Sequence, residues 1–346
     1  MENTIHDIYC RLQDEKSRNI FSNRLLFNLT KDMRFLKNVV KESCVYDRFC
    51  TIFKNLGSDK KIIIFGAGEL GKWFYELFED NEYFCTECFI DNNKSGELKK
   101  IPIVSLKTYG EKIKSQKVFV CSWLYHQELC NELYSCGCLK ENIINVVDII
   151  HEIWDEKQYF DLEPLCKLRT EQEVFIDGGC FNGKNSLRFS EWCNKRFKKI
   201  YAFEPDYKNF EKCRTAFDSF MSEDKYELYN MGLGKCKNTF TFIGNNGAGS
   251  RISSSGDENI KVTDLDSLVK EKVTYIKLDI EGAEYDAISG AKQIIQKYKP
   301  KMAVCVYHKV DDLWKLPSLI LQYNPDYKFY LRHYSVNSWE TVLYAL

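Results

Sequence analysis

The stretch Tyr275-Ile276-Lys277-Leu278-Asp279-Ile280-Glu281-Gly282-Ala283-Glu284 predicts a short buried strand that runs directly into a helix. Lys277 lies inside the apolar run, and the carboxylates Asp279, Glu281 and Glu284 follow it. A lysine is rarely buried without a partner, because an isolated buried charge is costly. In an open α/β sheet, ligands bind outside the carboxyl ends of the strands. The stretch therefore predicts such a sheet, with a functional site at the end of this strand.

A second strand with a polar end lies upstream, over Glu173–Ile176, and a glycine-rich turn and a helix follow it. Glycines let the backbone turn sharply and approach a ligand closely, and the helix presents free N–H groups. The next strand, Ile200–Phe203, ends in the carboxylate of Glu204. A nucleoside-binding α/β unit places the acid that holds the ribose about 20 residues after the glycine turn. The turn residues of interest are Asp177, Gly178, Gly179, Asn182 and Gly183.

Taken in chain order, these segments resemble the FkbM family of S-adenosylmethionine-dependent methyltransferases. The resemblance extends from about residue 170 to the C-terminus, and its most specific part is the Lys-x-Asp-x-Glu-Gly-x-Glu run. The glycine turn departs from the usual family pattern because Gly178 is inserted and the asparagine is shifted. The segments that carry the resemblance are Asp177-Gly-Gly to Gly183, Phe203-Glu204-Pro205, Asn230-Met231-Gly232-Leu233-Gly234, Leu265-Asp266 and Lys277–Glu284.

The resemblance implies a class I methyltransferase-like doubly wound α/β sheet with a terminal antiparallel hairpin, and S-adenosylmethionine as cofactor. It assigns Glu204 to the ribose hydroxyls and the backbone near Asn230 to the adenine side. It assigns Asp177 and the turn to the methionine end. The cofactor-binding residues expected on this basis are Asp177, Gly178, Gly179, Asn182, Gly183, Glu204, Asn230 and Asp279.

The catalytic residues are expected where strands end. Asp279 and Glu281 should lie near the methyl group, with Lys277 as their buried counter-charge. Glu281 could instead only cap the following helix, where the helix dipole favours an acid. His308 follows the apolar strand Met302–Tyr307, and a histidine there is suited to take a proton near neutral pH. The alternative for His308 is a structural histidine bonded to the backbone.

Four further residues are expected to contact the substrate. Arg332 and His333 end the first strand of a predicted terminal hairpin, Tyr327–Tyr334 with Glu340–Ala345. Ser250 and Arg251 lie in the glycine- and serine-rich loop Gly247–Ser253, which either closes over the substrate or is a plain hairpin loop.

The N-terminal half predicts different domains. Residues 1–58 read as helices, one over about Ser17–Leu29 and one over about Lys31–Phe53. Residues 59–150 alternate strands and helices and predict a Rossmann-like domain, followed by a connector over 151–170 and the methyltransferase domain over 171–346. The Rossmann-like domain contains the dinucleotide-type pattern Gly66-x-Gly68-x-x-Gly71, with Asp91 at the end of the next strand. We expect it either to bind a nucleotide or nucleotide-sugar or to serve as a scaffold.

The composition limits the cellular location of the protein and the kinds of partner that it can bind. The chain has 346 residues and a formal net charge of −1, so no basic field favours nucleic acid or acidic lipid. No apolar run approaches the ~18 residues of a membrane span, and Met1–Asp7 is no hydrophobic signal, which predicts a cytoplasmic protein. The fifteen cysteines should then be reduced. Cys85-x-x-Cys88 and Cys136-x-Cys138 lack a matching second ligand pair, so we expect core cysteines and no metal site.

These observations predict a methyltransferase that methylates a hydroxyl group of a sugar or glycan. One alternative is a nucleotide-sugar oxidoreductase with a nicotinamide on the Gly66–Asp91 unit, but no Tyr-x-x-x-Lys pair follows there. The other is a binding module without turnover, against which the intact carboxylates argue.

Overall fold

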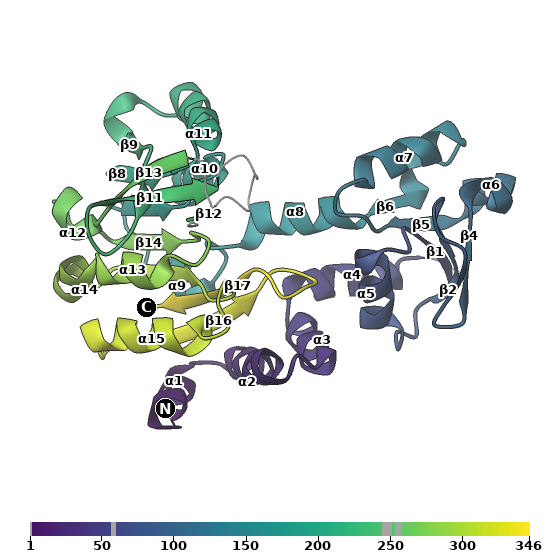
Figure 1. Cartoon of the computed structure of the whole chain (residues 1–346), viewed down its shortest axis with the longest axis horizontal. Helices are drawn as coiled ribbons and strands as arrows, with labels where there is room; N and C mark the ends of the chain where they lie inside the picture. The colour runs from purple at the N-terminus through teal and green to yellow at the C-terminus, as the bar shows by residue number, and fades with distance from the viewer. Residues whose placement is uncertain (1, 57–59, 244–250, 253–257) are drawn as a thin grey trace. The chain divides into compact units, whose positions relative to one another are not determined.

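The computed structural model describes residues 2–56, 60–243, 251–252 and 258–346, and its chain divides into two compact units (Figure 1). Unit 1 comprises Met1–Glu42 and Asp155–Leu346, and unit 2 comprises Ser43–Trp154. Residues 1–58, treated above as one helical segment, are thus shared between the two units. No helix in the described ranges combines the length and the apolar character needed to cross a bilayer.

The main sheet of unit 1 has seven strands in the order β16-β17-β15-β14-β7-β8-β9. Strands β15, β14, β7, β8 and β9 are parallel, while β17 runs antiparallel to both β15 and β16. This arrangement confirms the predicted α/β sheet with its terminal hairpin. The strands are β7 (Val174–Gly178), β8 (Lys199–Phe203), β9 (Tyr226–Tyr229), β14 (Tyr275–Leu278), β15 (Lys301–Cys305), β16 (Phe329–His333) and β17 (Thr341–Ala345).

A smaller sheet of unit 1 has the order β10-β13-β11-β12. Its centre is the antiparallel pair of β11 and β13, in which Phe240 is opposite Ile260. The strands are β10 (Gly232–Leu233), β11 (Asn238–Ile243), β12 (Arg251–Ile252) and β13 (Glu258–Thr263).

The helices of unit 1 include three at the N-terminus. The predicted helix over Lys31–Phe53 is wrong as a single element, because α3 ends at Lys41 and α4 begins at Cys44. Ser43 causes the break, since its Oγ accepts a hydrogen bond from the backbone N–H of Tyr46 at 3.1 Å and caps the new helix. The helices of unit 1 are α1 (Glu2–Arg11), α2 (Glu15–Thr30), α3 (Met33–Lys41), α9 (Glu163–Lys167), α10 (Lys184–Trp192), α11 (Tyr207–Phe220), η3 (Glu223–Lys225), α12 (Leu265–Leu268), α13 (Glu284–Ser289), α14 (Lys292–Tyr298) and α15 (Asp312–Tyr323).

Unit 2 is built on a six-stranded sheet in the order β3-β4-β2-β1-β5-β6, parallel except for the β3–β4 pair. Helix α4 belongs to this unit because its Phe49 and Phe53 pack against Phe74 and Phe78 of α5. The elements are α4 (Cys44–Lys54), β1 (Lys61–Phe65), α5 (Glu69–Phe78), β2 (Cys85–Ile90), β3 (Gly96–Leu98), β4 (Ile101–Val104), α6 (Leu106–Tyr109), η1 (Gly110–Ser115), β5 (Lys117–Val120), α7 (His126–Ser135), η2 (Lys140–Asn142) and β6 (Ile143–Asn145), and α8 (Val146–Lys157) crosses the division between the units.

Candidate active site

The strand register brings the predicted site residues of unit 1 to one edge of the main sheet. Lys277 of β14 is paired with Asp177 of β7, and Leu278 is paired with both Gly178 and Val304. The carboxyl ends of β7, β14 and β15 therefore coincide. The polar residues that follow these strands lie together at this edge, as the sequence predicts for an open α/β sheet.

Lys277 and Asp177 form a buried ion pair at this edge. The Lys277 Nζ is 3.1 Å from Asp177 Oδ1 and donates to the carbonyls of Gly178 and Gly179, at 3.1 and 2.7 Å. Ser186 Oγ donates to the other oxygen of Asp177 at 2.7 Å. Burial alone lowers the pKa of Lys277, but the charges of Asp177 and Asp279 outweigh it and raise this pKa. Asp177 thus fixes the strand ends from inside the unit.

The glycines of the turn are required by the packing of the unit itself. A Cβ on Gly179, whose φ is +77°, would lie 1.9 Å from the carbonyl oxygen of Asp279. A Cβ on Gly183 would lie 2.8 Å from the ring of Phe217, and one on Gly178 would lie 2.8 Å from Leu278. Asn182 accepts a hydrogen bond from the backbone N–H of Lys184 at 3.1 Å. Close packing within the unit thus requires these glycines, and their contact with a cofactor stays a prediction.

Glu204 ends β8 beside this turn and is almost fully buried. Its two oxygens accept the backbone N–H groups of Phe181 at 2.9 Å and of Asp206 at 3.0 Å. Burial raises the pKa of Glu204 to about 7, although both hydrogen bonds lower it. The Asn230 amide donates to the carbonyls of Glu204 and Pro205, at 2.9 and 3.0 Å, and so holds the ends of β8 and β9 together. Each Glu204 oxygen keeps a lone pair for a further donor.

Three carboxylates surround the imidazole of His308. Its Nδ1 is 3.0 Å from Glu284 Oε1, and its Nε2 is 3.6 Å from Asp279 Oδ1 and 3.7 Å from Glu281 Oε2. Burial alone lowers the pKa of His308, but these carboxylates outweigh it and raise the pKa to about 9. A histidine with this pKa is protonated at neutral pH and has no lone pair with which to take a proton. The geometry therefore supports an imidazolium that organises the acids, a different role from the general base expected above.

This charge state predicts how stability depends on pH. The pKa of folded His308, about 9, lies above its ordinary value of 6.5, so the stabilisation is complete below pH 6.5 and is lost as pH rises through 9. The shift corresponds to roughly 3 kcal/mol of unfolding free energy. Urea unfolding of the wild type and of His308→Gln should show a stability difference that shrinks over this pH window. Parallel pH profiles for the two proteins would show that His308 is not charged in the folded state.

Sequence reasoning missed three residues that complete the site: Tyr159, Tyr307 and Glu340. The Tyr159 hydroxyl donates to Asp279 Oδ2 at 2.8 Å. The Tyr307 hydroxyl lies 3.3 Å from Asp279 Oδ1 and 3.2 Å from Glu340 Oε1. Burial and the charge of Asp279 raise the pKa of Glu340 to about 7. Tyr307 ends the predicted strand Met302–Tyr307 and could have been found. Tyr159 lies in the predicted connector, and Glu340 begins the last predicted strand, where no pattern marks either residue as part of the site.

Asp279 also belongs to a group of potential metal ligands with Cys305 and Glu340, whose ligand atoms lie within 4.8 Å of one another. The Tyr159 hydroxyl lies among them, 3.4 Å from Cys305 Sγ. Hydrogen bonds with Tyr159 and Tyr307 thus join the side chains of this group. All fifteen cysteines lie in the described ranges and are free thiols.

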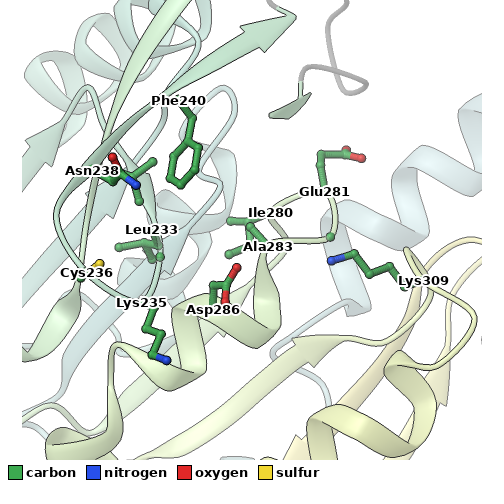
Figure 2. A pocket seen from close by; sticks show the side chains of 13 residues that line it. Leu233, Lys235, Cys236, Asn238, Phe240, Ile280, Glu281, Ala283, Asp286 and Lys309 are labelled. Atoms are coloured by element: carbon green, nitrogen blue, oxygen red, sulfur yellow. The ribbon is translucent and has the colours of Figure 1, made fainter. Parts of the chain in front are cut away.

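A hollow of about 420 Å³ opens beside Glu281 (Figure 2). Figure 2 shows Asn238 and Phe240 on one wall, and Glu281 and Lys309 on the other. Glu281 has a φ of 54°, which is uncommon for a residue other than glycine and marks local strain. Its side chain is 36% exposed. Glu281 thus belongs both to the acid cluster and to the lining of the hollow.

Of the four residues expected to contact the substrate, Arg332 and His333 are bonded within the unit instead. Arg332 Nη2 pairs with Asp14 Oδ2 of the α2 cap at 2.6 Å. His333 is buried, lies 2.9 Å from the Thr341 hydroxyl, and has its pKa lowered to about 3 by burial and by Arg24. Ser250 lies outside the described residues, and Arg251 is described only as part of the backbone of β12.

In unit 2, the predicted fingerprint forms a turn between β1 and α5. Gly66 and Gly71 pack against backbone. A Cβ added at Gly66 would lie 2.5 Å from the carbonyl oxygen of Cys121, and one added at Gly71 would lie 1.8 Å from the carbonyl oxygen of Gly66. A Cβ added at Gly68 would meet no other part of the described chain within 4 Å, apart from its own sequence neighbours. Asp91 Oδ2 accepts the backbone N–H of Ala67 at 3.0 Å, so this acid ties the turn to the end of β2.

The comparisons with known proteins agree with this geometry. Residues 181–331 match the family model of the methyltransferase FkbM domain. The solved structure of methyltransferase FkbM from Methylobacillus flagellatus KT has 18% sequence identity and a TM-score of 0.50, and the match covers 88% of this chain and 99% of that chain.

Two other solved structures are less similar. An rRNA methylase from Streptococcus thermophilus has 14% identity and a TM-score of 0.34, covering 52% of this chain and 89% of its own. A putative methyltransferase from Streptococcus mutans in complex with SAH has 13% identity and a TM-score of 0.32, covering 58% of this chain and 97% of its own. A comparison with curated proteins gives no match. The family match confirms the resemblance that the strand-end motifs predicted: residues 181–331 match the methyltransferase FkbM domain.

Proposed function

We propose that this chain transfers the methyl group of S-adenosylmethionine to a hydroxyl oxygen of a sugar or glycan. The observation that carries the proposal is the position of Glu281, which lines the hollow while it contacts the acid and histidine cluster at the strand ends. When bound, the cofactor supplies an electrophilic methyl group on a positively charged sulfur. The protein must then hold the acceptor and remove its proton.

The end of β8 fits the ribose of the cofactor. Glu204 is a buried carboxyl group, and within the described residues each of its oxygens accepts one backbone N–H. Two neighbouring ribose hydroxyls would donate to the remaining lone pairs. We propose Glu204 as the ribose ligand, with the backbone near Asn230 on the adenine side and the Gly179–Gly183 turn at the methionine end.

The pKa of Glu204 makes cofactor binding dependent on pH. Hydroxyl donors favour the ionised carboxyl, so binding should release a proton wherever the free protein holds Glu204 protonated, below its pKa of about 7. Calorimetric affinity for S-adenosylmethionine should therefore rise by up to about tenfold per pH unit below 7 and level off above it. In Glu204→Gln this dependence should vanish, and binding should weaken by roughly 1.5–3 kcal/mol. Equal pH profiles in both proteins would exclude Glu204 from the cofactor site.

The hollow suits a sugar as acceptor. Phe240 is 38% exposed and offers an apolar platform, while Lys235, Asn238, Asp286 and Lys309 offer polar groups around it. Ring faces and hydroxyls of a sugar match such a mixture of apolar and polar groups. Within it we propose Glu281 as the acceptor of the hydroxyl proton, positioned by the imidazolium of His308.

The product of the reaction tests the proposed function. The full chain would be incubated with S-adenosylmethionine labelled in its methyl group and with a panel of free, nucleotide-linked and oligomeric sugars. The proposal predicts a labelled methyl ether. Labelled methylation only at nitrogen or carbon, across acceptors that offer all three atoms, would contradict it.

We also propose that the reaction takes place in the cytoplasm, in keeping with the free thiols.

We further propose that unit 2 binds a nucleotide or nucleotide-sugar at the β1–α5 turn, because the space at Gly68 is open. Titration of the full chain with nucleotides and nucleotide-sugars should show binding that S-adenosylmethionine does not displace. A Gly68→Val side chain would fill the open space and should abolish this binding without loss of stability. Unchanged binding in that variant would place the ligand elsewhere, and absence of binding in the wild type would favour a scaffold.

A further inference from the structure

Arg24 is a buried cation whose charge is not neutralised within the described part of the chain. It lies on α2, is 3% exposed, and has no hydrogen-bond acceptor for Nε or Nη1 among the described residues. The ring of Phe27, one turn along the helix, lies 5.6 Å away and offers only a cation–π contact. Burying a guanidinium without a counter-charge is costly, and burial lowers the pKa of Arg24 to about 10.

Two hydrogen bonds fix the position of Arg24 over the site edge. Ser17, two turns earlier on α2, accepts the backbone N–H of Leu331 in β16 at 2.9 Å. Asn28, one turn later, donates to the carbonyl of Val310, just beyond β15, at 2.9 Å. Residues 17, 24 and 28 share one helix face, which is buried. Arg24 therefore lies between the end of β16 and the loop that carries His308.

The residues around Arg24 do not neutralise it. Its charge acts on Tyr307 and on His333, which is buried and neutral. Asp14, which caps α2, is already paired with Arg332. Tyr307 is also the residue whose hydroxyl lies 3.3 Å from Asp279 Oδ1, so the charge of Arg24 acts on a residue of the site edge.

We infer that Arg24 binds an oxyanion of the acceptor, a carboxylate or a phosphate, next to the Asp279 edge. The planar guanidinium fork matches both groups, and an anion would neutralise the buried charge. The assignment of this anion to the methyl acceptor rests on the proposed function. Binding of an anion by Arg24 is a property of the free protein and does not depend on methyl transfer.

Thermal unfolding of the full chain without any methyl donor tests the inference. At constant ionic strength, inorganic phosphate, glucuronate and glucose 6-phosphate would each be compared with chloride and with neutral glucose. We expect at least one oxyanion to raise the Tm of the wild type and glucose to leave it unchanged. In Arg24→Gln and Arg24→Met, the apparent affinity for that oxyanion should fall by about tenfold or more.

Stability without added anions provides a second readout. Arg24→Met removes an uncompensated buried charge and should raise the Tm, whereas Arg332→Gln, the matched control with a paired arginine, should lower it and keep the anion effect. The oxyanion that acts distinguishes a carboxylate from a phosphate ester. No oxyanion effect in the wild type, or an equal effect in the Arg24 variants, would overturn the inference. Failure of methyl transfer alone would leave this result unchanged.

Discussion

Glu281→Gln should lower the rate of methyl transfer by about 10²–10⁴-fold while leaving cofactor affinity within about twofold. The amide keeps the shape and the contacts of the side chain but cannot take the proton of the acceptor hydroxyl. Glu281 is the member of the cluster that also lines the hollow, where the acceptor is proposed to bind. The measurement is single-turnover methyl transfer at saturating cofactor, together with calorimetry of S-adenosylmethionine binding to each protein.

Two matched variants assign the effect to the right carboxylate. Asp286→Asn changes another acid of the same hollow and should alter KM more than kcat. Glu340→Gln changes a partly buried carboxyl group with a pKa of about 7, at the far side of Tyr307. Near-normal turnover in Glu281→Gln with strong loss in Glu340→Gln would make Glu340 the base.

Lys277→Met should lower the free energy of unfolding by roughly 3–5 kcal/mol. The substitution leaves Asp177 as a buried charge without its cation and removes the donor to the Gly178 and Gly179 carbonyls. Because that turn is part of the proposed cofactor site, S-adenosylmethionine binding should weaken as well. Urea unfolding and calorimetry of the same preparation measure both effects.

The matched control for Lys277 is Lys301, which forms a buried pair with Glu173 at 2.7 Å, at the opposite end of the strands. Lys301→Met should also destabilise the fold but should leave cofactor affinity unchanged. Removing both charges, in Lys277→Met with Asp177→Asn, should recover part of the lost stability. A Lys277→Met protein as stable as the wild type would show that the pair contributes little.

The positions of the strand-end carboxylates could be predicted from the sequence because parallel strands align their carboxyl ends. Lys277 within an apolar run predicted a buried partner, and Asp177 supplies it from the neighbouring strand. Glu204 and Asp279 followed in the same way, each from an apolar run that ends in an acid. The acids at this edge of the sheet could therefore be predicted, because each prediction needed only local periodicity and a parallel sheet.

The side-chain partners across the edge could not be predicted, because they come from segments distant in sequence. Tyr159 contacts Asp279 from a segment 120 positions away, and the charge of Arg24, on an N-terminal helix, acts on Tyr307. The charge of His308 depends on the cluster of three acids, which only the fold brings together. His333 lies at the predicted edge, but its ring contacts the Thr341 hydroxyl. The sequence did not show on which face of the hairpin this side chain would lie.

The most direct test of the central claim is calorimetric titration of the purified full chain with S-adenosylmethionine and with its demethylated product. We expect saturable binding of both, with one ligand per domain of the FkbM type. Binding should weaken in Glu204→Gln by roughly 1.5–3 kcal/mol and should be unaffected in Arg24→Met. No binding of either compound to a folded protein, at neutral pH and at ligand concentrations up to about 1 mM, would contradict the assignment of this domain as a methyltransferase that uses S-adenosylmethionine.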